Sequence, residues 1–297
     1  MISHDEVLGI ICLNLIALGI LGNSFLLYLY GHKSITGHRI KPMNMIVIHI
    51  AFSNSMLILF GGVPKIMQIW VFKSFLVCSE VKIITYLIRM ARGLSLCSSC
   101  LLSVSQAITI SPYSPMWAGL KARAPKCTLP CCLFCWVLNL LIAIFIPMYV
   151  TCPKNSSKER GNIWYSSLDL HAINTIKIAI WKSVYDGLFV GLLTITSSYM
   201  MLILYRHHRR VQYIHQTNMS LRTSPEVRAT KAILILMISF VCFTTISSPF
   251  SVYMIYSEET KHWVIHGIII LSLCHPAVSP FILISSDTQI TWACHAF

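Results

Sequence analysis

The sequence predicts an all-α membrane protein, a seven-transmembrane helix bundle with its N-terminus outside the cell and its C-terminus in the cytosol. The first observation is composition, because 56% of the 297 residues are hydrophobic and only 11% are charged. So few charges could not cover the surface of a soluble domain of this length. The second is that the apolar residues gather in seven blocks, each long enough to cross a bilayer as a helix.

These blocks define the predicted spans. A bilayer core about 30 Å thick needs roughly 20 apolar residues as helix, and backbone groups in lipid must hydrogen-bond within their own segment. The first block is too long for a signal peptide and follows acidic residues, so it is expected to be retained. In a single domain of residues 1–297, the spans are residues 7–30, 43–63, 78–110, 127–150, 183–205, 232–256 and 263–284.

The third observation is the distribution of Lys and Arg, which sets the orientation. Connections 31–42, 111–126 and 206–231 carry twelve of these residues, and the opposite segments carry eight, of which five lie in one long loop. Short basic loops stay in the cytosol. The net charge of +13 is therefore assigned to cytosolic loops beside membrane lipids, and no nucleic-acid partner is expected.

Ionisable residues inside the predicted spans form a candidate binding site. Lys82, Arg89 and Arg92 share one stripe of the third span, since Arg89 lies about 20° from Lys82 and Arg92 about 60° from Arg89. The guanidiniums of Arg89 and Arg92 lie too deep in the predicted bilayer to reach water, so they should face the bundle interior. They would either bind an anionic or hydrogen-bond-accepting small molecule or form an ion pair with Asp186 of the fifth span. The two roles are compatible.

Several strings give the chain a family resemblance over nearly its whole length. They are Gly19-Ile20-Leu21-Gly22-Asn23, Ser99-Cys100-Leu101-Leu102-Ser103-Val104, Gln106-Ala107-Ile108-Thr109-Ile110-Ser111-Pro112, Pro147-Met148-Tyr149-Val150-Thr151, Leu204-Tyr205-Arg206-His207, Ser224-Pro225-Glu226 and Ser279-Pro280-Phe281. On these strings the chain resembles the vomeronasal type 1 receptors, which are G-protein-coupled receptors for pheromone-like odorants. The Asp/Glu-Arg-Tyr string of most rhodopsin-like receptors is replaced by Ser105-Gln106-Ala107, which is normal in the vomeronasal family.

The resemblance implies a plasma-membrane receptor with a small odorant as ligand and an inhibitory-class heterotrimeric G protein as partner. The basic residues Arg206, Arg209, Arg210 and Arg228 would contact that partner at the cytosolic face. Three alternatives stay open: a bitter-taste-type receptor, a receptor-derived protein that no longer signals, and, less favoured, a channel or transporter.

The resemblance also suggests two modifications of the outer loop. Cys78 lies where seven-helix receptors anchor a disulfide, but the family's Tyr-Cys-Ser string reads Tyr165-Ser166-Ser167 here. We therefore expect a Cys78–Cys152 disulfide, with two free thiols as the alternative. Asn155 begins a glycosylation sequon on the same side of the membrane.

Two pairs of cysteines have spacing that can indicate a metal or redox site. Cys97 with Cys100 and Cys132 with Cys135 lie in predicted spans without a further pair or a nearby His. Buried cysteines that pack as small apolar side chains are the expected outcome. Since no set of catalytic acid, base and nucleophile occurs either, we expect no enzyme activity and no cofactor.

Overall fold

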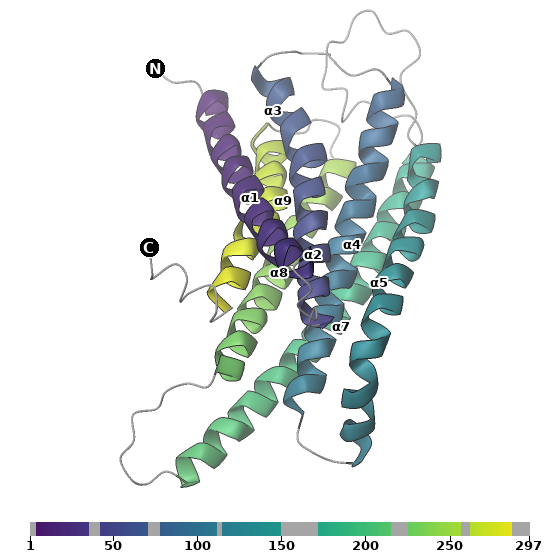
Figure 1. Ribbon diagram of the computed structural model, residues 1–297. Coiled ribbons are helices and arrows are strands. Elements are labelled where there is room, and N and C mark those ends of the chain that lie inside the picture. Colours follow the sequence, from purple (N-terminus) through teal and green to yellow (C-terminus); the bar gives the residue numbers. More distant parts are fainter. Residues whose placement is uncertain are drawn as a thin grey trace, which may run out of the picture.

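The structure, a computed structural model, describes residues 4–35, 42–70, 78–111, 115–149, 172–214, 225–256 and 262–286 (Figure 1). A continuous helical stretch formed by α2, the π-helical segment η1 and α3 supplies one crossing. Within the described residues, seven helices are long and apolar enough to cross a membrane. The elements are α1 (His4–Ile35), α2 (Pro42–Met56), η1 (Leu57–Gly62), α3 (Val63–Trp70), α4 (Cys78–Ile110), α5 (Pro115–Tyr149), α7 (Ala172–Ile214), α8 (Pro225–Tyr256) and α9 (His262–Ser286).

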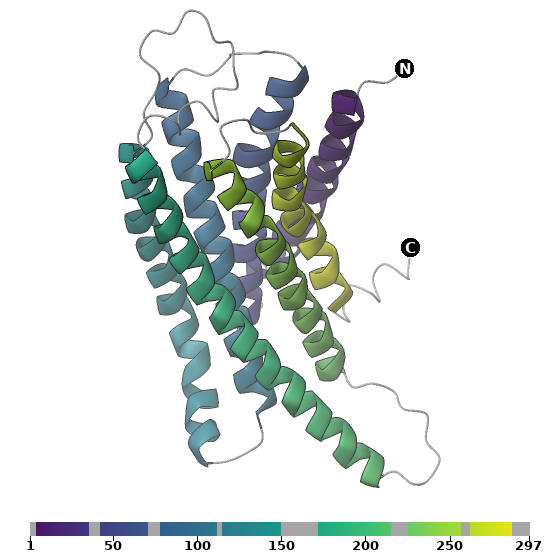
Figure 2. The ribbon, with the colours of Figure 1, turned by 180° about the vertical axis from the view of Figure 1, so that it is seen from behind.

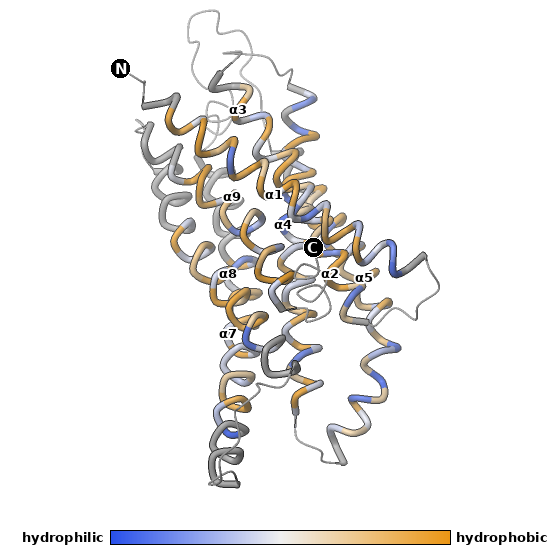
Figure 3. The backbone as a smooth tube through the Cα atoms, turned by 60° about the vertical axis from the view of Figure 1, so that its left-hand side comes forward, coloured by the Kyte–Doolittle hydropathy of each residue, from blue (hydrophilic) through white to orange (hydrophobic). Residues whose placement is uncertain are grey.

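The helix α4 lies at the centre of the bundle and packs against α2, α5 and α7. Two-thirds (67%) of its apolar window is buried, whereas only 11% of the α7 window is. Apolar residues prevail along the helices between their ends, which is the pattern expected of helices in lipid (Figure 3). The central position of α4 means that polar side chains on it must find their partners on neighbouring helices.

The ends of the bundle are defined by the chain direction. We call the end that holds the C-terminal ends of α4 and α7 the inner end. The helix α1 begins and α9 ends toward opposite ends of the bundle, as an odd number of crossings requires (Figure 1). Which end faces the cytosol stays a prediction from the basic residues.

Several helices extend beyond the spans predicted from hydropathy. The chain from Pro115 onward is already helical in α5, although residues 111–126 were expected to form a connection. Likewise α7 continues to Ile214, past the predicted end at residue 205, and Figure 2 shows it crossing the bundle and projecting beyond its neighbours. Hydropathy marks where a helix meets lipid, and a helix does not have to end there. Pro42, Pro115 and Pro225 are the first residues of α2, α5 and α8, and proline suits the first turn because an N–H there has no helical partner to lose.

The helices α1 and α9 approach closely because α1 has glycines at the contact. A Cβ atom added at Gly19 would lie 2.5 Å from Ile58 Cδ1 and 3.2 Å from the Ala277 backbone. One added at Gly22 would lie 2.7 Å from Pro280 Cγ. Small residues at such contacts let helix backbones pack in membranes.

This close approach allows Asn23 to satisfy a carbonyl that a proline has left without a donor. In a helix, the N–H of residue 280 would bond to the carbonyl of residue 276, but Pro280 has no N–H. Asn23 Nδ2 donates to the Pro276 carbonyl over 2.9 Å instead. The hydrogen bond therefore fixes the register of α1 on α9.

A second buried network joins α2, α4 and α9. Asn54 Nδ2 donates to Ser279 Oγ over 2.7 Å, and Ser95 Oγ donates to Asn54 Oδ1 over 3.0 Å. All three side chains are buried. Asn54 is thus the shared member, and its removal would leave both serines without these partners.

We predict that Asn54→Ala destabilises the protein by about 1–3 kcal/mol, because it leaves buried hydroxyls unsatisfied. The measurement is the thermal unfolding midpoint of detergent-solubilised protein. Asn14→Ala is the matched control, since Asn14 is exposed and donates to the Ile10 carbonyl of its own helix. Equal effects of the two substitutions would contradict the role given to Asn54.

Candidate functional site

An ion pair joins α4 and α7 at the candidate site. Arg92 Nη2 of α4 lies 3.4 Å from Asp186 Oδ2 of α7. The side chains are 29% and 17% exposed, so both are largely enclosed by protein. Arg92 faces the bundle interior, as the stripe on the third span predicted, and does not point into lipid.

The second guanidinium lies beside this pair. Arg89 is half-buried and lies within electrostatic reach of both Arg92 and Asp186. Asp186 is the one acid in the seven apolar windows. Two guanidiniums therefore lie near one carboxylate, with which Arg92 forms the ion pair. Lys82 of the same stripe is half-buried nearer the N-terminal end of α4.

His275 of α9 belongs to the same interior region and was missed by the sequence analysis. It is only 7% exposed, and its ring packs edge-on against Phe240 of α8 at 4.4 Å between centroids. It also lies within electrostatic reach of Arg92. Among the described residues, neither His275 Nε2 nor Arg92 Nε has a hydrogen-bond partner. An ionisable residue directly before a proline within the seventh apolar block was the available signal.

A buried polar layer lies next to the ion pair. Tyr185, the neighbour of Asp186, donates from its hydroxyl to Asn139 Oδ1 of α5 over 2.7 Å. Asn139 Nδ2 in turn donates to the Cys135 carbonyl over 2.7 Å and to Cys97 Sγ over 3.3 Å. This layer ties α4, α5 and α7 together one residue from the charged pair.

Further polar contacts continue along α4 and α7 to the inner end. Ser103 Oγ donates to Thr196 Oγ1 over 2.7 Å, and the Ser111 and Tyr199 hydroxyls lie 3.2 Å apart. We call this row, from Arg92–Asp186 to Ser111–Tyr199, the α4–α7 seam. Lys121 of α5 closes its inner end by donating to the Ser111 carbonyl over 2.7 Å. The seam thus comprises three polar contacts between α4 and α7, spaced from the charged pair to the inner end.

Comparison with known protein families assigns the chain. The model of the vomeronasal organ pheromone receptor family matches residues 7–296. The chain belongs to this family. It is 37% identical to the human protein "Vomeronasal type-1 receptor 3" over 98% of this chain and 94% of the relative. It is 36% identical to human "Vomeronasal type-1 receptor 4" over 100% and 99% of the two chains.

A relative outside mammals also matches over most of its length. The zebrafish protein "Olfactory receptor class A-like protein 1" is 31% identical over 92% of this chain and 87% of the relative. Family membership and the seven apolar helices establish a chemosensory receptor of the G-protein-coupled type, a multi-pass protein of the plasma membrane.

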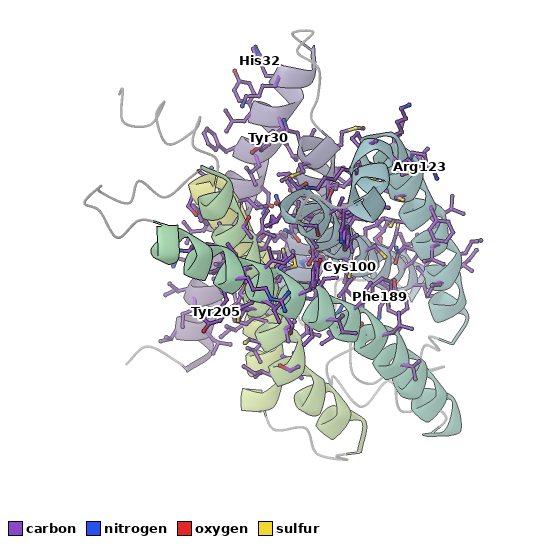
Figure 4. All side chains as sticks on the ribbon, turned by 90° about the horizontal axis from the view of Figure 1, so that it is seen from below. Tyr30, His32, Cys100, Arg123, Phe189 and Tyr205 are labelled. Carbon is purple, nitrogen blue, oxygen red and sulfur yellow. The ribbon has the colours of Figure 1, made fainter. Side chains whose placement is uncertain are left out.

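The cysteines of this vomeronasal-family receptor that have metal-like spacing are buried. Cys97, Cys100, Cys132 and Cys135 all lie in the protein interior. Figure 4 shows Cys100 near the middle of the bundle, where its Sγ lies 3.8 Å from the Phe189 carbonyl. In the part of the chain that the structure describes, no group of three or more His, Cys, Asp or Glu is placed to hold a metal ion.

Several predicted site residues lie outside the described residues and stay predictions. They include the loop positions Cys152 and Asn155 and the side chain of Cys78, so the disulfide and the glycosylation site are not described. Arg206 is exposed near the inner end on α7. The backbones of three further basic residues are helical, but their side chains are outside the description: Arg209, Arg210 and Arg228.

We predict that Gly93→Ala disrupts the buried polar layer. A Cβ atom at Gly93 would collide with the Asn139 side-chain amide and lie 3.0 Å from the Tyr185 hydroxyl. Overpacking of this kind costs about 1–3 kcal/mol, and we expect a lower thermal unfolding midpoint and less protein at the cell surface. Gly187→Ala is the control, because no atom lies within 4 Å of a Cβ placed there. If the Gly93→Ala protein is as stable as the control, the polar layer rearranges around the new methyl group without loss of stability, which contradicts the prediction.

Proposed function

We propose that this receptor binds a small pheromone-like odorant with an anionic or strongly hydrogen-bond-accepting group, and that Lys82, Arg89, Arg92 and Asp186 form the binding site. The observation that carries the proposal is the enclosed Arg92–Asp186 pair with Arg89 beside it. Intramembrane charges are costly and usually serve function. Here the positive charge exceeds the negative charge.

The chemical class follows from that imbalance. A single carboxylate, Asp186, cannot neutralise both guanidiniums, and burial makes an uncompensated charge expensive. A ligand carboxylate or sulfate would supply the missing negative charge and accept the planar set of N–H groups that a guanidinium offers. The 3.4 Å separation of Arg92 and Asp186 is long for a charged hydrogen bond, so a ligand oxygen could compete for Arg92.

Activation is a ligand-driven population shift along the α4–α7 seam. A ligand favours the active packing only if it binds that packing more tightly than the resting one. When a ligand oxygen competes for Arg92, the contact between Arg92 and Asp186 weakens. Tyr185, the neighbour of Asp186, still holds α7 to Asn139 through a shorter hydrogen bond of 2.7 Å. In this mechanism α7 turns about the Tyr185–Asn139 contact and carries the change to Tyr199 at the inner end.

The partner in this proposal is a heterotrimeric G protein of the inhibitory class. Arg206, Arg209, Arg210 and Arg228 lie on the parts of α7 and α8 nearest the predicted cytosolic connection. The end of α7, which carries three of these arginines, projects beyond the neighbouring helices (Figure 2). A basic helix end beside anionic lipid headgroups suits a peripheral cytosolic partner.

We predict that Arg92→Gln raises the half-maximal concentration of an activating carboxylate odorant about tenfold to hundredfold, because a hydrogen bond to a charged group contributes about 1.5–3 kcal/mol. The assay is G-protein activation by a panel of acidic and neutral volatiles in cells with matched surface expression. Arg123→Gln is the matched control, because Arg123 is exposed at the periphery of the bundle (Figure 4).

The exchanged pair, Arg92→Asp with Asp186→Arg, separates the two roles of the arginine. If Arg92 only clasps α4 to α7, the exchange restores the response to every odorant. If it binds ligand, surface expression recovers but the response to acids does not. If no odorant of the panel activates a receptor that reaches the cell surface normally, the result would contradict signalling and favour a receptor-derived protein that no longer signals.

We predict that a toxin which ADP-ribosylates inhibitory-class α subunits abolishes the odorant response. The response of Arg206→Ala should fall severalfold in amplitude at unchanged half-maximal concentration, because the exposed guanidinium touches the partner and not the ligand. The measurement is the fall in cyclic AMP after odorant addition. A toxin-insensitive response would exclude the inhibitory class.

A further inference from the structure

Cysteine exposure divides the described thiols of this chain into different groups. Five are buried: Cys12, Cys97, Cys100, Cys132 and Cys135. Cys242 is exposed, but it lies 12 residues beyond Thr230, about 18 Å along α8 and therefore deep among lipid chains. Cys274, partly exposed, is similarly deep in α9. Cys127, which is exposed, and Cys131, which is partly exposed, remain; they follow the basic first part of α5, which begins at Pro115.

The depth of this pair follows from the length of α5. From Cys127 to the helix end at Tyr149 the rise is about 33 Å, close to the ~30 Å thickness of the hydrocarbon core. Lys126 directly precedes Cys127, and Arg123 lies one turn earlier, with both side chains exposed. Cys127 therefore lies at the border between headgroups and hydrocarbon, and Cys131 one turn deeper.

The two cysteines also share a face of α5. Cys131 lies about 40° from Cys127 around the helix, and the same stripe continues through Phe134 and Leu141, both of which are exposed. Exposed apolar side chains within a membrane helix face lipid. A chain attached at Cys127 and directed into the membrane would run along Phe134 and Leu141.

We propose that Cys127 and Cys131 are S-acylated with long-chain fatty acids. Membrane-proximal cysteines beside basic residues are the usual acceptors of this modification. The thiolate sulfur attacks the thioester carbonyl carbon of a fatty acyl-coenzyme A, and a new carbon–sulfur bond forms. The old thioester bond breaks, and coenzyme A leaves as the thiol with the proton from the cysteine. The site requires the inner end to face the cytosol, where the acyl donor is found.

The test uses the full-length receptor expressed in cultured mammalian cells. Free thiols are blocked with N-ethylmaleimide, thioesters are cleaved with hydroxylamine, and the released thiols are labelled with a maleimide that carries a polyethylene glycol mass tag. We expect Cys127→Ser and Cys131→Ser each to lose one hydroxylamine-dependent tag relative to the wild-type receptor, and the double variant to lose two. Cys242→Ser, the matched exposed but deep control, should lose none.

Two results would overturn the proposal. One is a wild-type receptor without any hydroxylamine-dependent tag. The other is a Cys127→Ser/Cys131→Ser receptor that keeps the wild-type number of tags, which would place the acyl groups elsewhere. Size-exclusion profiles of the solubilised variants show whether they fold, and Cys127→Ala with Cys131→Ala provides a second version of the double substitution.

Discussion

Lipid offers no hydrogen-bond partners, so each buried polar group of this bundle depends on the protein for one. The contact between α1 and α9 follows from this constraint. Pro280 leaves the Pro276 carbonyl without its helical donor, and Asn23 supplies a replacement over 2.9 Å. The glycines of α1 bring the two helices close enough for that bond. Asn54 meets the same requirement between α2, α4 and α9.

The same constraint has a different outcome between α4 and α7, where the groups are charged. Tyr185 and Asp186 are neighbours in sequence, yet one forms a 2.7 Å hydrogen bond to α5 and the other a 3.4 Å pair with α4. The short bond positions α7, and the long pair leaves Arg92 open to a competing oxygen. In the proposed mechanism, the short bond serves as the support and the long pair as the contact that a ligand exchanges.

The number of crossings and the stripe of Lys82, Arg89 and Arg92 could be predicted from the sequence. Both depend on local properties, namely hydropathy and the 100° rotation per residue of a helix. It could not decide which arginine meets Asp186. That choice depends on how α7 is rotated and shifted against α4, which is set by distant contacts such as Ser103–Thr196. The helices extend past the predicted spans for a related reason: α5 begins at Pro115, within a basic segment that hydropathy assigns to a loop. His275 escaped notice because its burial depends on Phe240 from another helix.

Two of the unsatisfied buried atoms lie in the charged region, and the proposed ligand role would give them a partner. A clasp that served only stability would be expected to use all its donors, since an unsatisfied buried group costs about 1–3 kcal/mol. Within the described residues, Arg92 Nε and His275 Nε2 both lack partners and lie within electrostatic reach of each other; Asn23 Oδ1, Ser99 Oγ and Ser197 Oγ lack partners elsewhere in the bundle. In the proposed function, a ligand acceptor between α4 and α9 would offer a partner to these atoms. Binding there would reach α9 as well as α7, so a single anionic group could shift both helices that border α8.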